Sequence, residues 1–99
     1  MNRRAKFGPG AYADASEALA WEELTNGEHR ARLEGAFDRA PGLIEEFPQI
    51  GAAWRRDTRR FLVSGYRYAI IYRIDPGSIA IIAFAHTSRD PDYWLDRLP

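Results

Sequence analysis

One histidine and a run of arginines are the side chains whose types and positions could support chemistry in this 99-residue sequence. His86 follows a long apolar run, and a histidine titrates close to neutral pH. Between residues 55 and 73, six arginines accompany one acid, Asp57, which gives a local charge of +5. All basic residues except Lys6 are arginine, whose planar guanidinium binds phosphate or carboxylate through two hydrogen bonds. The arginine run indicates either an anion-binding surface or the solvated edge of a strand.

Other kinds of site find no support in the sequence. It has no His, Cys, Asp and Glu residues at the spacing of a metal site and no glycine-rich phosphate loop, so we expect no metal and no cofactor. The formal net charge is zero, which gives the protein as a whole no field that would attract nucleic acid. The sequence contains no cysteine and no signal-peptide pattern. It also has no apolar run of roughly 20 residues, the length of a membrane helix. We therefore expect a single cytoplasmic domain over residues 1–99.

A β-hairpin near the C-terminus is the element expected to position these residues. Two apolar runs, 68–74 and 79–85, flank the turn sequence Asp75-Pro76-Gly77-Ser78. Apolar side chains occupy both faces of each run, so we expect the hairpin to be covered on both sides and to form the centre of the sheet. Strict alternation along the second strand would place His86 at its end, on the face of Ile82 and Phe84.

Two helices are predicted before the hairpin. Residues 11–24 are rich in alanine, glutamate and leucine, which favours a helix. Its expected buried stripe consists of Tyr12, Ala15, Ser16 and Leu19. A second helix starts near Glu28, after an Asn-Gly pair that ends the first. Its expected buried stripe consists of Leu33, Phe37, Ala40, Ile44 and Phe47. Pro41 and Gly42 interrupt this stripe, so we expect a kink there or two helices that share one seam.

The remaining segments complete a small α+β fold. Residues 3–8 are predicted to form a short first strand, and residues 53–64 a strand with a basic edge. Trp54 is expected to cover the edge of the sheet. Asp90 and Pro91 suit the start of a short terminal helix over residues 90–98. The predicted order is β-α-α-β-β-β-α, in which an N-terminal helical hairpin packs on a small antiparallel β-sheet and a short C-terminal helix follows.

The C-terminal tail carries the most distinctive pattern of the sequence. It reads His-x-x-Arg-x-Pro-x-Tyr-Trp-x-x-Arg and is formed by His86, Arg89, Pro91, Tyr93, Trp94 and Arg97. Further characteristic stretches are residues 17–23, residues 43–51, and the Arg59-Arg60 pair followed by residues 66–73. Together they resemble the RelE/ParE toxin superfamily, the toxins of bacterial type II toxin–antitoxin pairs, and the ParE branch more closely. The resemblance covers almost the whole chain.

The resemblance implies a fold, a partner and a target. The family fold is a helical hairpin packed on an antiparallel sheet, in agreement with the order of elements derived above. Members are growth inhibitors that a cognate antitoxin holds inactive in a hetero-oligomeric complex. The C-terminal segment of the antitoxin folds along the toxin surface as it binds. ParE-like members poison DNA gyrase, whereas RelE-like members cut messenger RNA on the ribosome. We expect gyrase to be the target here, because a neutral net charge suits a protein target better than the ribosome.

The alternative is a ribosome-dependent endoribonuclease, which needs a general base, a general acid and cations around the phosphate. The resemblance implies Arg67, His86 and Tyr93 for these catalytic roles. RelE-like enzymes also use lysines, and this sequence has only Lys6. His86 could rescue this activity, although the simpler expectation is a structural histidine hydrogen-bonded to the following loop or helix. A third alternative is a non-toxic member that mainly binds its antitoxin.

A toxin that acts by binding needs a contact surface rather than catalytic groups. The residues predicted to bind the target or the antitoxin are Arg59, Arg60, Arg67, Arg73, Arg89, Trp94 and Arg97. Arginine and aromatic side chains dominate the binding energy of protein interfaces. Tyr93 and Trp94 could instead pack the terminal helix against the sheet. Arg89 and Arg97 could instead form surface ion pairs with the nearby Asp92 and Asp96, or bind an acidic antitoxin segment.

Overall fold

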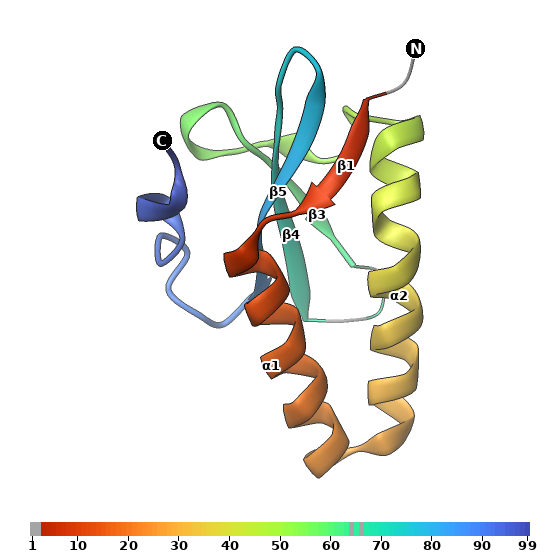
Figure 1. The fold of residues 1–99 in the computed structure, drawn as a ribbon. Helices are drawn as coiled ribbons and strands as arrows, with labels where there is room; N and C mark the ends of the chain where they lie inside the picture. Colours follow the sequence, from red (N-terminus) through yellow and green to blue (C-terminus); the bar gives the residue numbers. More distant parts are fainter. Residues whose placement is uncertain (1–2, 64, 66) are drawn as a thin grey trace.

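Two helices pack against one five-stranded sheet in the computed structural model, which describes residues 3–63, 65 and 67–99 (Figure 1). The strand order in the sheet is β1-β5-β4-β3-β2, and both helices follow β1 in the sequence. The predicted α+β class, with a helical hairpin on a sheet, is confirmed. Across the described residues, neither helix has the combination of length and apolar character that crossing a bilayer would require.

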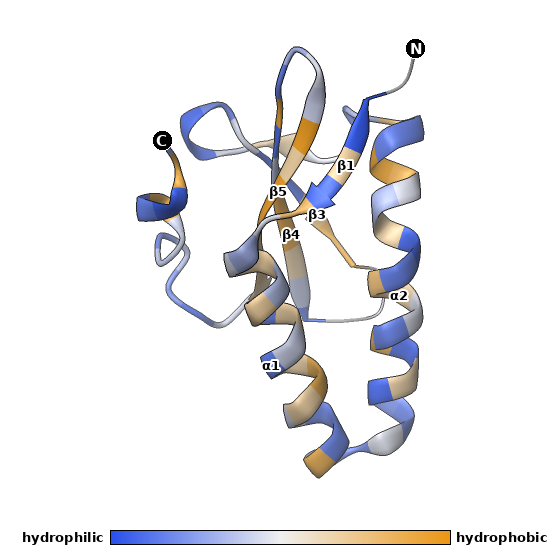
Figure 2. Cartoon of the chain, viewed as in Figure 1, coloured by the Kyte–Doolittle hydropathy of each residue, from blue (hydrophilic) through white to orange (hydrophobic). Residues whose placement is uncertain are grey.

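The predicted central hairpin is confirmed. It pairs β4 (Tyr68–Ile74) with β5 (Ser78–His86) in antiparallel orientation. Both strands lie in the interior of the sheet, with β1 on one side and β3 on the other. Eight buried residues of β4 and β5 belong to an apolar cluster, and Figure 2 shows hydrophobic segments on both strands. The hairpin therefore supplies most of the core.

A β-bulge in β5 changes which side chains share a face. Ile81 and Ala83 pair with consecutive residues of β4, so Ile82 is an extra residue between them. Such an insertion shifts the alternation of side chains by one position. Phe84 therefore lies on the helix-facing side with Ile81, and the predicted shared face of Ile82 and Phe84 is wrong. His86 keeps its predicted place at the end of the strand, on the face of Phe84.

The first strand makes the sheet mixed. β1 (Arg4–Phe7) pairs with β5 in parallel orientation, whereas the other three strand pairs are antiparallel as expected. The ladder ends at Phe7, and the next N–H, that of Gly8, donates to the carbonyl oxygen of Ile81 at 2.9 Å. Within the described part of the chain, the second half of β5 has no strand on this side. Its backbone groups must find other partners.

The predicted helical hairpin consists of α1 (Pro9–Thr25) and α2 (Gly27–Glu46). A single residue, Asn26, joins them. Its side-chain oxygen accepts hydrogen bonds from the backbone N–H groups of Glu28 at 3.1 Å and His29 at 3.4 Å. These bonds satisfy two of the donors that the first turn of a helix leaves open, so α2 starts directly after Asn26.

Of the two alternatives predicted at Pro41, separate helices are wrong, because α2 continues through this residue as one helix. A proline inside a helix removes one hydrogen bond and crowds the carbonyl group four residues earlier, here that of Phe37. Ala40 and Ile44, on either side of Pro41, are both buried against the sheet. Their packing stabilises the helical conformation more than the proline destabilises it.

The buried face of α1 differs from the prediction. It consists of Ala11, Asp14, Ala15 and Ala18. Tyr12 and Ser16, two of the four predicted residues, are exposed, and Leu19 is partly buried. Small alanine side chains let the helix approach β5 closely, and large side chains are left on the outside. In α2 the predicted stripe is confirmed except at its end, where Phe47 is exposed.

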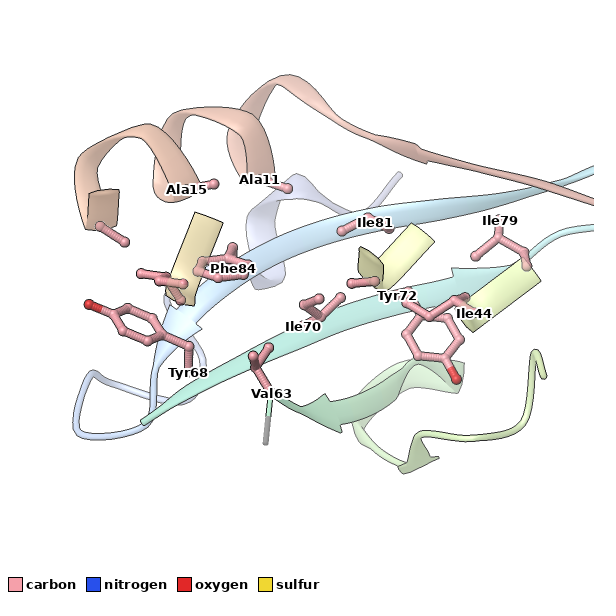
Figure 3. Packing of buried hydrophobic residues seen from close by; sticks show 13 residues of the cluster. Ala11, Ala15, Ile44, Val63, Tyr68, Ile70, Tyr72, Ile79, Ile81 and Phe84 are labelled. Carbon is pink, nitrogen blue, oxygen red and sulfur yellow. The ribbon is translucent and has the colours of Figure 1, made fainter. Parts of the chain in front are cut away.

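Each face of the sheet has an apolar cluster, as predicted for the central hairpin. The larger cluster lies between the sheet and the helices, and its sheet residues are Val63, Tyr68, Ile70, Tyr72, Ile79, Ile81 and Phe84 (Figure 3). Ala11 and Ala15 of α1 cover it. The smaller cluster is on the opposite face and consists of Ile71, Ala83 and Trp94. Trp54 packs against this smaller cluster.

The predicted strand over residues 53–64 is wrong in its middle. The chain forms two short antiparallel strands, β2 (Ala52–Ala53) and β3 (Arg59–Leu62). Between them it turns through a short 3-10 segment, in which two consecutive residues have left-handed backbone conformations. The sequence signals of this turn are weak because it contains no glycine or asparagine. Ser64, the last residue of the predicted strand, and Tyr66, the first residue of the characteristic stretch 66–73, lie outside the described residues.

The predicted terminal helix over residues 90–98 is also wrong. The segment forms turns followed by one 3-10 turn, Leu95–Arg97. The Asp90 carboxylate accepts a hydrogen bond from the Asp92 N–H at 2.9 Å, but a regular helix does not continue from there. Trp94 is only 1% exposed and packs on the smaller cluster. Burial of this large ring stabilises a compact, irregular segment in place of a helix.

Tyr72 allows a test of how the end of the helical layer is held to the sheet. Its buried hydroxyl donates to the carbonyl oxygen of Pro48 at 2.6 Å and accepts from the N–H of Gly51 at 2.9 Å. We expect Tyr72→Phe to lower the free energy of unfolding by about 1–3 kcal/mol, because both partner groups lose their hydrogen bond. Urea unfolding measures this change, with Tyr12→Phe on the exposed face of α1 as the control. A loss below about 0.5 kcal/mol would contradict the assigned role.

Candidate functional site

A buried carboxylate, that of Asp14 in α1, joins three parts of the chain. Its side chain is 5% exposed. Oδ2 accepts hydrogen bonds from the Tyr93 hydroxyl at 2.8 Å and from the Phe84 backbone N–H at 3.1 Å. Arg97 binds both carboxylate oxygens, from Nη1 to Oδ2 at 2.7 Å and from Nη2 to Oδ1 at 3.1 Å. These four residues form the Asp14 cluster, which connects α1, β5 and the C-terminal segment.

The end of β1 and the bulge in β5 create the place for this cluster. Beyond β1, the Phe84 N–H and the Ile82 carbonyl oxygen lie at the side of β5 that faces α1 and the C-terminal segment. Asp14 accepts from the first group, and Arg97 Nη1 donates to the second at 3.0 Å. Gly10 makes room for the guanidinium, since a Cβ atom there would lie 2.7 Å from Arg97 Nε. An ion pair thus satisfies backbone groups that a neighbouring strand would otherwise bind.

The cluster sets the protonation states of its members. Burial acts to raise the pKa of Asp14, but hydrogen bonds from Arg97, Tyr93 and Phe84 outweigh it and hold that pKa below its usual range. Burial, the hydrogen bond to Asp14 and the charge of this carboxylate all raise the pKa of Tyr93. At neutral pH, Asp14 is therefore ionised and Tyr93 keeps its proton as a hydrogen-bond donor.

His86 makes contacts with the loop that follows it, as expected for a structural histidine. Its Nδ1 accepts a hydrogen bond from the Ser88 N–H at 3.1 Å and lies 2.6 Å from the Ser88 hydroxyl. The ring stands edge-on to Tyr68, with 5.2 Å between the ring centroids. Because Nδ1 accepts, a neutral His86 carries its proton on Nε2.

A groove runs past His86 between α1 and the end of the central hairpin. One part, of about 540 Å³, is lined by Asp14, Glu17, Ala18, Ala20, Trp21, Leu24, Tyr68, Phe84, His86, Ser88 and Arg89. A second part, of about 420 Å³, is lined by Trp21, Glu22, His29, Arg32, Gly65, Arg67, Tyr68 and His86. The two parts share three lining residues, and we call them together the His86 groove. Its lining combines aromatic and aliphatic side chains with acids, histidines and arginines.

The three residues predicted for RNA cleavage occupy two different places. Arg67 and His86 both line the His86 groove, and the Thr87 N–H donates to the Arg67 carbonyl oxygen at 2.7 Å. The Tyr93 hydroxyl instead binds the Asp14 carboxylate. In the described part of the chain, no group of three or more His, Cys, Asp or Glu side chains is arranged to hold a metal ion.

The residues predicted to bind a partner differ in how their side chains are engaged. Arg73 binds the Asp75 carboxylate from Nε at 2.8 Å and Nη2 at 3.2 Å, and Arg59 donates to the Gly51 carbonyl oxygen at 2.7 Å. Arg60 lies over the ring of Trp54, at 5.0 Å from its centroid. These contacts leave parts of the three guanidinium groups to the surface.

Arg89, Trp94 and Arg97 lie in the C-terminal segment. Arg97 pairs with Asp14, so the expected ion pairs with Asp92 or Asp96 are wrong for this residue. Arg89 is exposed and stacks over the Tyr93 ring at 3.6 Å from its centroid. Trp94 is buried, which confirms the packing role considered for it. Its predicted contact with a partner would require the C-terminal segment to move.

Asp14 is the residue that sequence reasoning missed. It lies three residues after Ala11, one residue before Ala15 and four residues before Ala18, so it shares their stripe. The predicted stripe of Tyr12, Ala15, Ser16 and Leu19 included the large side chains of α1 and left Asp14 out. A single acidic residue inside a stripe of alanines was the available signal, because a buried acid requires a basic or hydrogen-bonding partner.

The fold and the site define a class of small α+β proteins in which a helical hairpin covers one face of a sheet and a C-terminal segment covers the other. Residues 6–91 match the family model described as ParE toxin of type II toxin-antitoxin system, parDE. The chain therefore belongs to the ParE toxin family. No curated protein sequence matches it.

A solved structure supports the fold assignment. It is titled "Chromosomal ParDE TA system from P. aeruginosa" and matches this chain with a TM-score of 0.74 and 14% sequence identity. The match covers 85% of this chain and 95% of that chain. At this level of identity, the likeness concerns the fold alone.

The Asp14 cluster predicts a specific pH dependence of stability. The pKa of Asp14 is lower in the folded than in the unfolded state, so its contribution is present above about pH 4 and is lost as the pH falls. We expect Asp14→Asn to lower the free energy of unfolding by about 2–4 kcal/mol at pH 7, because Arg97 loses its charged partner. This difference from the wild type should shrink as the pH is lowered from about 4 to about 2.5.

Chemical denaturation at a series of pH values measures this difference. Asp38→Asn, on the exposed part of α2, is the matched control because it removes one exposed carboxylate. We expect the control to remain within about 0.5 kcal/mol of the wild type at all pH values. A difference for Asp14→Asn that stays constant across the acid range would contradict the assignment of a low pKa to Asp14.

Proposed function

We propose that this protein is the toxin of a type II pair and that it arrests growth by binding DNA gyrase and stabilising its cleaved-DNA state. Membership of the ParE family supports the role of toxin. The observation that favours binding over RNA cleavage is the Asp14 cluster. The Tyr93 hydroxyl, which was predicted to take part in RNA cleavage, is hydrogen-bonded to a buried carboxylate that also binds Arg97. They stabilise the fold, and the protein acts through its exposed surface.

The His86 groove is the surface that best fits a cognate antitoxin. Trp21 and Leu24 in α1 are 62% and 84% exposed, and both line the first part of the groove. Arg89 lines the first part of the groove and Arg67 the second. An antitoxin segment with apolar side chains flanked by acidic ones would cover these groups. The protein would then occur in the cytoplasm as an inactive hetero-oligomer with its antitoxin.

A ribosome-dependent endoribonuclease is the second candidate, and one observation favours it. Arg67 and His86 line the same part of the groove, together with His29 and Arg32. Two histidines and two arginines could bind an RNA phosphate and move a proton. Tyr93 could join them only if its hydrogen bond to Asp14 were broken. A non-toxic protein that only binds antitoxin is the remaining alternative.

Purified protein free of antitoxin distinguishes these functions when tested on gyrase and ribosomes in parallel. With gyrase, supercoiled plasmid and ATP, we expect loss of supercoiling activity and accumulation of cleaved DNA. With translating ribosomes and a defined message, we expect the message to remain intact. Cut message without cleaved DNA would contradict the proposed function and establish the nuclease. Antitoxin binding with neither activity would establish the non-toxic alternative.

Arg67→Ala tests whether the groove contributes to toxicity. Its guanidinium is exposed and lines the groove, so its removal should relieve growth arrest while the thermal midpoint stays within about 2 °C of the wild type. Arg39→Ala removes an exposed arginine from α2 and should leave growth arrest unchanged. Colony formation after induction measures toxicity, and circular dichroism measures the midpoint. Equal effects of both variants, or unfolding of Arg67→Ala, would contradict a contact role.

His86→Gln separates the binding and nuclease functions. Glutamine preserves hydrogen-bonding capacity but cannot act as an acid or base near neutral pH. If the protein acts by binding, this variant should retain the cleaved-DNA signal with gyrase within about threefold of the wild type, since the change keeps the size and polarity of the side chain. Abolished message cleavage with unchanged antitoxin affinity would instead identify His86 as a catalytic residue.

A further inference from the structure

The protein has zero net charge, but its charges are distributed unevenly between the two helices and the rest of the chain. The helices α1 and α2 carry nine acidic residues and three arginines, a net charge of −6. The remaining chain carries five acidic and eleven basic residues, a net charge of +6. The helices lie together on one face of the sheet. The helices therefore form an acidic layer, and the remaining chain, with the sheet and its loops, forms a basic layer.

The tip of the β2–β3 hairpin belongs to this basic layer and is strained. Arg56 and Asp57 have φ angles of 53° and 62°, in the left-handed region. The Thr58 N–H donates to the Arg55 carbonyl oxygen at 3.1 Å, so these four residues form a type I′ turn. Asp57 suits the second central position of the turn, because Asp tolerates the left-handed conformation. The first central position, occupied by Arg56, is normally Asn, Asp or Gly. An exposed arginine at position 56 therefore costs folding stability that a glycine would not.

Neighbouring arginines are held in place around this tip. The guanidinium carbons of Arg55 and Arg60 lie 5.6 and 5.0 Å from the ring centroid of Trp54, which itself packs on the smaller apolar cluster. Arg55 also binds Asp92 at 2.8 Å. These contacts fix the side chains before any ligand arrives, and pre-organised groups lose little entropy on binding. The loop between β2 and β3 lies on the opposite side of the view from α2 in Figure 1, and Arg56 within this loop is exposed.

We propose that the β2–β3 hairpin, residues 52–62, contacts the phosphate backbone of duplex DNA within the gyrase complex. This inference rests on the proposed function, in which the toxin acts on gyrase that holds cleaved DNA. The hairpin carries four arginines against one acid, Asp57. Guanidinium groups match phosphate geometry, and a two-stranded β-ribbon fits the major groove of DNA. Backbone strain at Arg56 is consistent with a residue whose role is to contact a ligand rather than to stabilise the fold.

Arg56→Gly tests this proposal because it separates stability from binding. Glycine adopts the left-handed conformation without strain, so the thermal midpoint should rise by about 4 °C. The affinity for a short DNA duplex at about 50 mM salt should fall about five- to tenfold, and the slope of log affinity against log salt should decrease by about one. Fluorescence anisotropy of a labelled duplex measures both quantities. Arg39→Ala, on the acidic layer, removes the same charge and should change neither.

The same variants added to gyrase and plasmid complete the test. Arg56→Gly should give less cleaved DNA than the wild type and Arg39→Ala should give the same amount. If the wild type gives no cleaved DNA, the proposed function fails. If it does and Arg56→Gly matches it in cleaved DNA and duplex affinity, the hairpin proposal alone is overturned. A photo-reactive amino acid at the exposed position 53 should cross-link to DNA in the gyrase complex, and cross-links to gyrase protein alone would also overturn the proposal.

Discussion

The carboxylate of Asp14 joins α1 to two parts of the chain that are far from it in the sequence. It accepts hydrogen bonds from the backbone of β5, from Tyr93 and from Arg97, and it does so from inside a helix of mostly small side chains. A buried charge is costly unless it is paired and hydrogen-bonded, and these donors provide that compensation. The C-terminal segment is thereby fixed over the sheet face that the helices leave uncovered. Trp94 then completes the smaller apolar cluster.

This constraint determines which polar residues remain for function. Tyr93 was predicted to take part in RNA cleavage and Arg97 to bind a partner, but both side chains bind the buried Asp14 carboxylate. Arg67, His86 and Arg89 remain around a groove with exposed apolar side chains. A second surface, the basic β2–β3 hairpin, lies on the opposite layer and carries the strained Arg56. The molecule thus offers one groove suited to an antitoxin segment and one hairpin suited to a polyanion.

Much of the fold could be predicted from the sequence, because the patterns that indicate its helices and strands are local and strong. The hairpin of β4 and β5 follows from two apolar runs and a Pro-Gly turn, and α1 and α2 follow from composition and an Asn-Gly pair. The errors have different physical causes. A single-residue bulge at Ile82 is invisible in the sequence and reverses the faces beyond it. Tertiary packing carries α2 through Pro41, and burial of Trp94 replaces the predicted terminal helix with turns.

The site was harder to predict because its centre depends on a long-range contact. Asp14 and Arg97 are 83 residues apart in the sequence, so no local pattern connects them. Arg67 and His86 were predicted from the tail and strand patterns, and the structure does bring them to one groove. The turn at the strained Arg56 was not predicted, because it lacks the glycine that usually marks such a turn in a sequence. The sequence signal is weakest for residues whose role depends on a partner far along the chain or on backbone strain.

A double-mutant cycle between Asp14 and Arg97 tests the central claim most directly. Free energies of unfolding are measured at pH 7 for the wild type, Asp14→Asn, Arg97→Gln and the double variant. If this ion pair fixes the C-terminal segment, the interaction energy should be about 1.5–3 kcal/mol and should decrease below about pH 4. Effects that add to within about 0.5 kcal/mol at pH 7 would show that the two residues act independently and would contradict the account.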